Sequence, residues 1–398
     1  MSRKHKIWIL TEVFYPEVTA TSLIMTKIAN KLSQNNDVHV ICGAPVYSIQ
    51  NDSESYLKLN ESITVSRING FTGNKNKLLF RFCRYIFLST KMISKLKNEV
   101  TKEDSVLMVT NPALLVLFIN KLKQKIKFKL TILCHDVFPE NLLAAKVING
   151  FTNILKIIIN LFNKAYSSAD NLIVVGSDMK DVFEKKLVHQ KIKPNISVIR
   201  NWAELDTVFP VQRKEDYEKK IVFLFAGNMG RVQGLEKIVA LLAKINNPNL
   251  LFIFQGNGAV LSKLQNYASI LECNNIVFKP SYSRSQQNDV FSFCDIGMVS
   301  LLDEMYGLGV PSKTYNFLAA AKPIFFLGHP KSEISLLVKE HGIGYSFSLN
   351  DETSIISFLN SITIDQRKIF QEMGEKARFL AQKDYSEELI LNKIESLV

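Results

Sequence analysis

The segment that decides the fold is Phe225-Ala226-Gly227-Asn228-Met229-Gly230-Arg231-Val232-Gln233-Gly234-Leu235. It follows the apolar run 221–225 and opens a segment with helical spacing, which predicts a strand, a glycine loop and a helix start. Glycines let a backbone approach a ligand closely, and a helix N-terminus presents free N–H groups. Arg231 adds a planar cation suited to phosphate. We interpret the loop as a phosphate site; the alternative is a tight turn with a solvated arginine.

On both sides of this loop, short apolar runs alternate with helix-period segments, which is typical of parallel βαβ units. The alternation of strand and helix segments begins again after the charged stretch 212–220, so we predict two Rossmann-like α/β sheets facing a central cleft. We expect domains at 1–203 and 204–380, and a C-terminal helix at 381–398 that crosses back to the first domain. The predicted strands are Ile7–Leu10, Val38–Cys42, Ile63–Ile68, Val106–Val109, Lys129–Leu133, Leu172–Val175, Ile196–Ile199, Ile221–Phe225, Leu250–Phe254, Ile276–Phe278, Ile296–Ser300 and Pro323–Leu327.

Composition and charge narrow the class of protein. The chain has 398 residues, 47% of them apolar and 22% charged, as expected for a folded protein of two domains. Its apolar runs fall short of the roughly 20 residues that a membrane span needs. The first predicted strand begins near the start, so we expect a cytoplasmic protein without a cleavable signal.

The charge is divided unevenly between the two halves. Residues 1–200 hold 29 Lys and Arg against 15 Asp and Glu, whereas the rest holds 20 against 22. This asymmetry indicates that the first half meets an anion. Nucleic acid, an anionic membrane surface and a lipid phosphate are the candidates.

Pro311-Ser312-Lys313 marks a second candidate for phosphate binding. It predicts a helix start, with Ser312 as N-cap and Lys313 in the first turn. The helix dipole opposes a lysine there by roughly a few tenths of a kcal/mol, which a bound anion would offset. We interpret Lys313 as a second diphosphate contact; the alternative is a lysine that points into water. Gln255-Gly256-Asn257-Gly258 resembles half a dinucleotide fingerprint and is interpreted as a turn.

Polar residues also follow strands of the first half. His135 and Asp136 end a predicted strand, where they can donate to sugar hydroxyls or stabilise developing charge. A structural histidine is the alternative. In the loop after the first strand, Thr21 or Ser22 is the expected N-cap of a helix that begins at Leu23. The sequence contains no Asp-x-Asp, so no metal site is predicted.

The stretch 75–97 is basic and rich in aromatic residues, and its cations include Lys77, Arg81 and Arg84. This pattern predicts an amphipathic helix on an anionic membrane surface. The alternative is a helix packed on its sheet with ordinary surface lysines. Since no nucleic-acid-binding motif is present, we expect a membrane rather than nucleic acid as the partner.

Together these segments resemble family 4 of the GT-B glycosyltransferases over nearly the whole chain. The resemblance is closest to the bacterial O-antigen and capsule branch, which includes fucosaminyltransferase-like members. It implies retaining, metal-independent transfer of an N-acetylated amino or deoxyamino sugar from a UDP-sugar, without a further cofactor. The implied acceptor is an undecaprenyl-diphosphate-linked saccharide at the inner face of the cytoplasmic membrane. The motifs that carry the resemblance are Tyr15-Pro16-Glu17, His135–Glu140, Val198–Trp202, Gly227–Gly234 and Pro311-Ser312-Lys313.

The resemblance also assigns roles to residues. His135, Asp136, Arg231 and Lys313 are the expected catalytic residues, with Arg231 and Lys313 on the donor diphosphate and His135 on the transferred sugar. The expected donor-binding residues are Gly227, Asn228, Gly230, Arg231, Lys279, Pro280, Ser312, Lys313 and Asn316. The expected acceptor and membrane residues are Glu17, Thr19, Thr21, Lys77, Arg81 and Arg84.

The chain departs from the family at specific positions. The usual pair of glutamates would fall on Leu308 and Asn316, neither of which is acidic. The lysine that usually follows the phosphate arginine would fall near Gln233, and we infer that Lys313 replaces it. Two rival functions stay open: a UDP-sugar 2-epimerase of the same architecture, and a catalytically inactive GT-B scaffold that binds a membrane.

Overall fold

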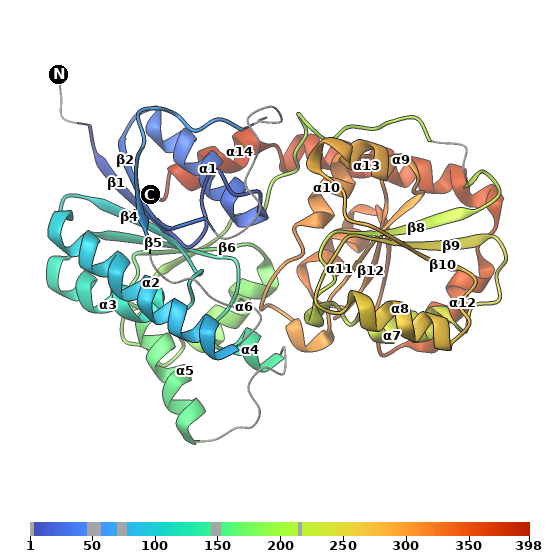
Figure 1. Cartoon of the computed structure of the whole chain (residues 1–398), viewed down its shortest axis with the longest axis horizontal. Helices are drawn as coiled ribbons and strands as arrows, with labels where there is room; N and C mark the ends of the chain where they lie inside the picture. Colours follow the sequence, from blue (N-terminus) through green and yellow to red (C-terminus); the bar gives the residue numbers. More distant parts are fainter. Residues whose placement is uncertain (1–3, 46–56, 70–77, 145–152, 214–216) are drawn as a thin grey trace.

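The computed structural model describes residues 4–45, 57–69, 78–144, 153–213 and 217–398, without the side chains of residues 78–81. Two α/β sheets lie side by side, each with helices packed around it (Figure 1). The first sheet has seven parallel strands in the order β3-β2-β1-β4-β5-β6-β7. Its strands are β1 (Lys6–Thr11), β2 (Asp37–Gly43), β3 (Thr64–Ile68), β4 (Ser105–Val109), β5 (Lys129–Cys134), β6 (Asn171–Val174) and β7 (Asn195–Val198). Its helices are α1 (Ala20–Ser33), α2 (Leu78–Glu99), α3 (Leu115–Ile126), α4 (Glu140–Ala144), α5 (Asn153–Tyr166) and α6 (Ser177–Lys186).

The second sheet has six parallel strands in the order β10-β9-β8-β11-β12-β13. Its strands are β8 (Ile221–Ala226), β9 (Leu250–Gln255), β10 (Ile276–Lys279), β11 (Ile296–Ser300), β12 (Ile324–Leu327) and β13 (Gly344–Phe347). The helices of this half are α7 (Leu235–Leu242), α8 (Leu261–Ile270), α9 (Gln287–Ser292), α10 (Lys313–Ala319), α11 (Glu333–His341), α12 (Glu352–Ser361) and α13 (Arg367–Asp384), and the chain ends with α14 (Glu387–Glu395). The predicted fold class is confirmed. The sequence did not predict β13, because Gly344-Tyr345-Ser346-Phe347 lacks an apolar run and forms a half-buried edge strand.

Burial on both faces explains why most strands are continuous apolar runs. In β1, Trp8 and Leu10 point into one core cluster of the first sheet. Ile7 and Ile9 point into the cluster on the opposite face. β8 divides its side chains between the two faces of the second sheet in the same way.

The end of the chain returns to the first sheet. Helix α13 packs against α10 of the second half, whereas α14 packs against α1 of the first half (Figure 1). Ile390, Leu391 and Ile394 of α14 lie in the same buried cluster as strands β1 and β2. The crossing segment therefore completes one face of the first core.

One contact between the halves is apolar. Met305 and Leu308 follow β11 of the second sheet, yet they lie in a core cluster of the first sheet. The backbone N–H of Val137 donates to the carbonyl of Leu308 at 3.2 Å. Leu308 is one of the positions where the resemblance leads one to expect a glutamate. A carboxylate there would be buried among apolar side chains, which is costly without hydrogen-bond partners.

A second contact between the halves is hydrogen-bonded. Glu333, at the start of α11, pairs with Arg200 and accepts from the N–H and Oγ of Ser177 at 2.7 and 2.8 Å. In return, the N–H of Glu333 donates to Asp178 at 3.0 Å. The pKa of Asp178 is raised to about 6, mainly because its carboxyl group is buried. The N-termini of α6 and α11 are thus each satisfied by an acid from the other half.

Candidate functional site

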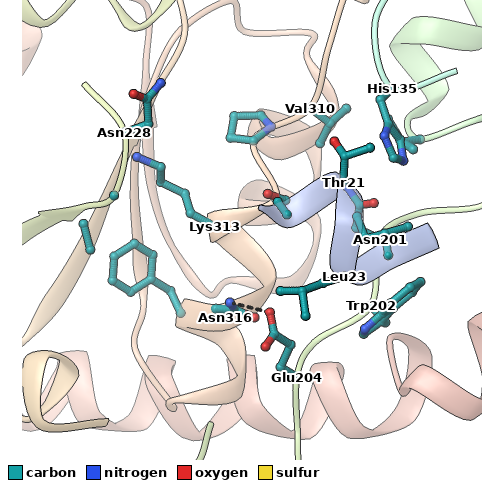
Figure 2. A pocket seen from close by; sticks show the side chains of 18 of the residues that line it. Thr21, Leu23, His135, Asn201, Trp202, Glu204, Asn228, Val310, Lys313 and Asn316 are labelled. Atoms are coloured by element: carbon teal, nitrogen blue, oxygen red, sulfur yellow. Dashed lines mark hydrogen bonds between the residues drawn. The ribbon is translucent and has the colours of Figure 1, made fainter. Parts of the chain in front are cut away.

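A cavity of about 610 Å³ opens between the two sheets. Its walls are segments that follow β1, β5, β6, β7, β8, β10 and β11, so it lies at the carboxyl ends of the strands, as expected for an α/β ligand site. Thr21 and His135 face it from the first half, Lys313 and Asn316 from the second (Figure 2). A more open hollow, lined by the turn 256–258 and Arg284, shares several residues with it and extends the cleft.

Two glycine segments of the second half line the cleft and its open extension. Gly227 has φ 108°, and a Cβ on Gly256 would lie 2.0 Å from the carbonyl oxygen of Gly227. The N–H of Met229 donates to Asn257 at 2.8 Å. The loop therefore needs glycine for close backbone contact as well as for any ligand. Its continuation differs from the expectation, because a short 3₁₀ turn at Arg231–Gln233 precedes α7.

Lys313 is the most unusual charge in the cleft. Its side-chain stem is partly exposed, but its Nζ is buried and has no hydrogen-bond partner among the described residues. The ammonium lies 3.4 Å from the centre of the Phe225 ring, and burial lowers its pKa to about 7. A Cβ on Gly227 would lie 3.9 Å from this Nζ. A lysine held beside a glycine loop without an anion is a cation poised for an anionic ligand.

One turn further along α10, Asn316 binds an acid of the linker, which is the segment between β7 and β8 that joins the two halves. Its Nδ2 donates to Oε1 of Glu204 at 3.1 Å (Figure 2). The other oxygen of Glu204 pairs with Arg284 at 2.5 Å. The position where the family has its second glutamate thus holds an amide in contact with a glutamate from elsewhere in the chain.

His135 and Asp136 form the opposite wall. Burial lowers the pKa of His135 to about 4, so its imidazole is neutral at pH 7, and its Nε2 lacks a hydrogen-bond partner within the described residues. Burial also raises the pKa of Asp136 to about 6. Asp136 forms an antiparallel bridge with Gly309 of the second half. A neutral imidazole at this wall can donate to or accept from a sugar hydroxyl.

The cleft brings together most of the residues that the sequence singled out. Those that line it are Thr21, His135, Asp136, Gly227, Asn228, Ser312, Lys313 and Asn316. Ser312 occupies the N-cap position of α10, but its side chain makes no capping bond. Among the described residues there is no cluster of three His, Cys, Asp or Glu that could hold a metal ion.

Other predicted donor residues lie outside the cavity wall. Arg231 is exposed on the 3₁₀ turn, and the N–H of Gly230 is taken by Gln233 at 2.6 Å. Lys279 lies 4.2 Å from the centre of the Phe293 ring and does not line the cleft, nor does the exposed Pro280. Their part in donor binding stays a prediction.

The structure corrects two expectations for the first half. Arg84 is buried and its Nε donates to Glu12 at 3.1 Å, so it is not an exposed membrane cation. Thr19, rather than Thr21 or Ser22, caps α1, accepting from the N–H of Ser22 at 3.1 Å. Glu17 is buried and does not line the cavity.

Two further cations of the expected membrane stretch cannot be placed. Lys77 lies outside the described residues, and so does the side chain of Arg81.

Sequence reasoning quoted Trp202 within a family motif but gave it no role in the site, and it assigned none to the rest of the linker or to the far end of the wall in the second half. Trp202, Glu204, Tyr282, Arg284 and Gln287 all line the cleft. None of them belongs to a glycine loop. Arg284 opens a 3₁₀ turn and Gln287 is the first residue of α9, and the other available signal was the acid in the otherwise apolar linker start 202–205. The turn 256–258, interpreted only as a turn, also lines the open hollow.

Two facing parallel sheets, with a glycine loop and a buried lysine at the cleft between them, define a protein of the GT-B class. The chain is 34% identical over 333 residues to the probable glycosyltransferase WbjE of Pseudomonas aeruginosa, a match that covers 82% of each chain. It therefore belongs to the glycosyltransferases of the GT-B fold. No protein-family model matches it.

Solved structures agree on the fold. WaaG, a glycosyltransferase involved in lipopolysaccharide biosynthesis, superposes with a TM-score of 0.68 at 13% identity, covering 98% of this chain and 99% of WaaG. An Escherichia coli structure, described as trehalose-6-phosphate bound with UDP-2-fluoro glucose, superposes with a TM-score of 0.72 at 11% identity, covering 98% of both chains. At these identities the likeness concerns the fold alone.

Proposed function

We propose that this glycosyltransferase moves a sugar from a UDP-sugar to a lipid-linked saccharide acceptor in bacterial O-antigen or capsule synthesis. The observation that carries the donor side is Lys313, whose buried Nζ has no hydrogen-bond partner among the described residues and lies beside the glycine loop. A nucleoside diphosphate is an anion that this ammonium can bind. The relative bound with UDP-2-fluoro glucose and the relative involved in lipopolysaccharide biosynthesis support the donor base and the pathway. By resemblance, the sugar is an N-acetylated amino or deoxyamino sugar, and its configuration is retained.

The proposed chemistry is charge stabilisation at the leaving group. The bond between the anomeric carbon and the diphosphate breaks, a bond from that carbon to an acceptor hydroxyl forms, and the hydroxyl proton leaves with the diphosphate. Lys313, the backbone at Gly227 and Arg231 stabilise the charge that develops on the diphosphate. His135, neutral because it is buried, binds a hydroxyl of the transferred sugar. No residue in this scheme requires a metal ion.

The test of the donor assignment is a calorimetric titration of the full chain with UDP, GDP, ADP and CDP. We expect UDP to bind most tightly, and Arg231→Ala to lower kcat/KM for transfer by about 10–100-fold, because a charged contact to the diphosphate is lost. Near-full activity of the variant would remove Arg231 from the site. Conversion of the UDP-sugar without an acceptor would instead favour the epimerase.

The proposed acceptor implies a membrane, and the structure suggests a different docking element from the one expected. None of the helices in the described ranges is long and apolar enough to span a membrane. Helix α5 projects from the lower edge of the first half (Figure 1). Ile154, Ile157 and Leu161 on it are 69%, 61% and 51% exposed, and Lys156 and Lys164 are exposed on the same helix. Exposed aliphatic side chains among lysines suit an anionic bilayer surface.

Vesicle co-sedimentation measures this docking. We expect the full chain to bind vesicles that contain phosphatidylglycerol and not vesicles of phosphatidylcholine alone. The double change Ile154→Ser with Ile157→Ser should weaken binding by at least about 10-fold, because two side chains no longer enter the interface. Ile270→Ser is the matched control, since Ile270 is 67% exposed on α8 of the other half. Equal binding to both vesicle types would reject the proposal.

A further inference from the structure

The linker between the two halves carries an acid into the cleft. Trp202 is buried in a core cluster of the first sheet, and Ala203 and Val208 are buried in one of the second sheet. The N–H of Ala203 also donates to the carbonyl of Tyr385 at 2.8 Å. Glu204 stands between these anchored residues and lines the cavity. Its backbone position is therefore fixed by both cores rather than by a loop of its own.

The carboxylate of Glu204 is oriented by two side chains of the second half. Asn316 donates to Oε1 at 3.1 Å and Arg284 pairs with Oε2 at 2.5 Å. The side chain of Glu204 is 19% exposed and that of Arg284 is 24% exposed, so both are largely shielded from solvent. An ionised carboxylate has about four acceptor positions, and these partners occupy one on each oxygen. Each oxygen can therefore still accept a hydrogen bond from a ligand.

The position of this carboxylate relative to Lys313 points to the kind of ligand it meets. Asn316 lies three residues beyond Lys313 on α10, which is about 4.5 Å along the helix axis. Figure 2 shows Lys313 pointing toward Asn228 and Glu204 bound on the other side of Asn316. If the diphosphate meets Lys313, the next unit of a nucleotide, its ribose, lies about one turn away. The vicinal hydroxyls of a ribose are two donors that match two free acceptor positions.

The other acids of the cavity wall are placed differently. Asp136 belongs to the opposite wall, where it bridges to Gly309. Asp206 is exposed further along the linker. Glu204 is thus the lining acid that is both shielded and anchored beside the donor helix.

We propose that Glu204 is a specificity-determining residue that accepts hydrogen bonds from the ribose hydroxyls of the donor nucleotide. Arg284 and Asn316 set the orientation of its carboxylate. This inference rests on the proposed function, in which the donor is a nucleoside diphosphate sugar. It also gives the linker a second task, because the chain that joins the halves contributes a side chain to the donor site.

The experiment compares ribose with 2′-deoxyribose by calorimetry on the full chain. The probes are whichever of UDP, GDP, ADP and CDP binds the unchanged chain most tightly, and its 2′-deoxy form. We expect the unchanged chain to prefer the ribose form by at least about 10-fold, the contribution of a hydrogen bond to a charged group. Glu204→Ala should bring the ribose form down to the affinity of the deoxy form, while the deoxy form changes by less than about 3-fold.

Two further variants make the result decisive. Asp206→Ala, on the same linker, should keep the full preference. Glu204→Gln keeps the size of the side chain, so it serves as the test if the alanine variant fails to fold. It should lose most of the preference for the ribose form. Equal weakening of both probes would show a structural role only and overturn the proposal. A preference that survives both changes at Glu204 would do the same. If none of the four diphosphates binds the unchanged chain, the proposed function itself is wrong. If one binds without a preference for ribose over 2′-deoxyribose, only the proposed role of Glu204 is wrong.

Discussion

Lys313→Met will strongly weaken the binding of a nucleoside diphosphate and, in the same protein, raise its resistance to unfolding. The ammonium of Lys313 is buried without a hydrogen-bond partner among the described residues, so the free protein bears the cost of desolvating it. Methionine fills a similar volume without a charge. We expect the affinity for UDP to fall by about 100-fold. We expect the free energy of unfolding at pH 7 to rise by about 1–4 kcal/mol.

The pH dependence has a definite sign. The native pKa of Lys313 is about 7, below the ordinary value of 10.5. Between these values the unfolded chain holds a proton that the native chain lacks, so this group makes stability increase with pH across that window. Methionine removes that increase. Binding of UDP near pH 8 should also take up a proton, because the diphosphate restores the charge, and calorimetry in two buffers of different ionisation enthalpy measures it.

Lys331→Met serves as the control, since Lys331 is an exposed lysine of the same half. It should change neither affinity nor stability by more than measurement error. A Lys313→Met protein that binds UDP within about 3-fold of the unchanged chain would remove Lys313 from the donor site. Lower rather than higher stability would show that the ammonium has a partner in solution.

Glu333→Ala should cost about 1–3 kcal/mol of the free energy of unfolding, because it removes the acceptor of two donors of Ser177 at the start of α6. Glu333 is 3% exposed and accepts from Ser177 and Arg200 of the first half. Its loss leaves the N–H and Oγ of Ser177 without that acceptor. Chemical denaturation followed by fluorescence measures the change.

Glu340→Ala is the matched control, since Glu340 is exposed on the same helix α11. We expect it to alter stability by less than about 0.5 kcal/mol. A loss at Glu333 no greater than at Glu340 would mean that the two halves are not joined through this acid. Small-angle scattering of the Glu333→Ala protein should also show a larger radius of gyration, because one of the contacts between the halves is gone.

Local patterns in the sequence were sufficient where a feature depends on neighbouring residues. The strands β1 and β8 are continuous apolar runs, and the glycine loop and Lys313 each follow a recognisable strand or helix signal. β13 lacks such a run, so only its pairing with β12 identifies it.

Features that depend on distant partners could not be read from the sequence. Arg84 lies in a basic, aromatic stretch that predicts an exposed helix face. It is buried instead, where it binds Glu12, which precedes it by 72 residues. Leu308 replaces an expected acid because it packs into the core of the other half. Glu204 is 112 residues from Asn316, so no spacing rule joins them. In each case the tertiary contact, and not the residue type, decides the role.

The return of α14 to the first sheet has a consequence for synthesis in the cell. β7, the last strand of that sheet, ends at Val198, whereas α14 begins only at Glu387. At about 5–20 residues per second, a ribosome needs on the order of 10–40 s to make the intervening chain. During that interval the nascent first half shows the apolar face that Ile390, Leu391 and Ile394 later cover. The half that is translated first is thus the half that is finished last, and that face is where a chaperone would engage the growing polypeptide.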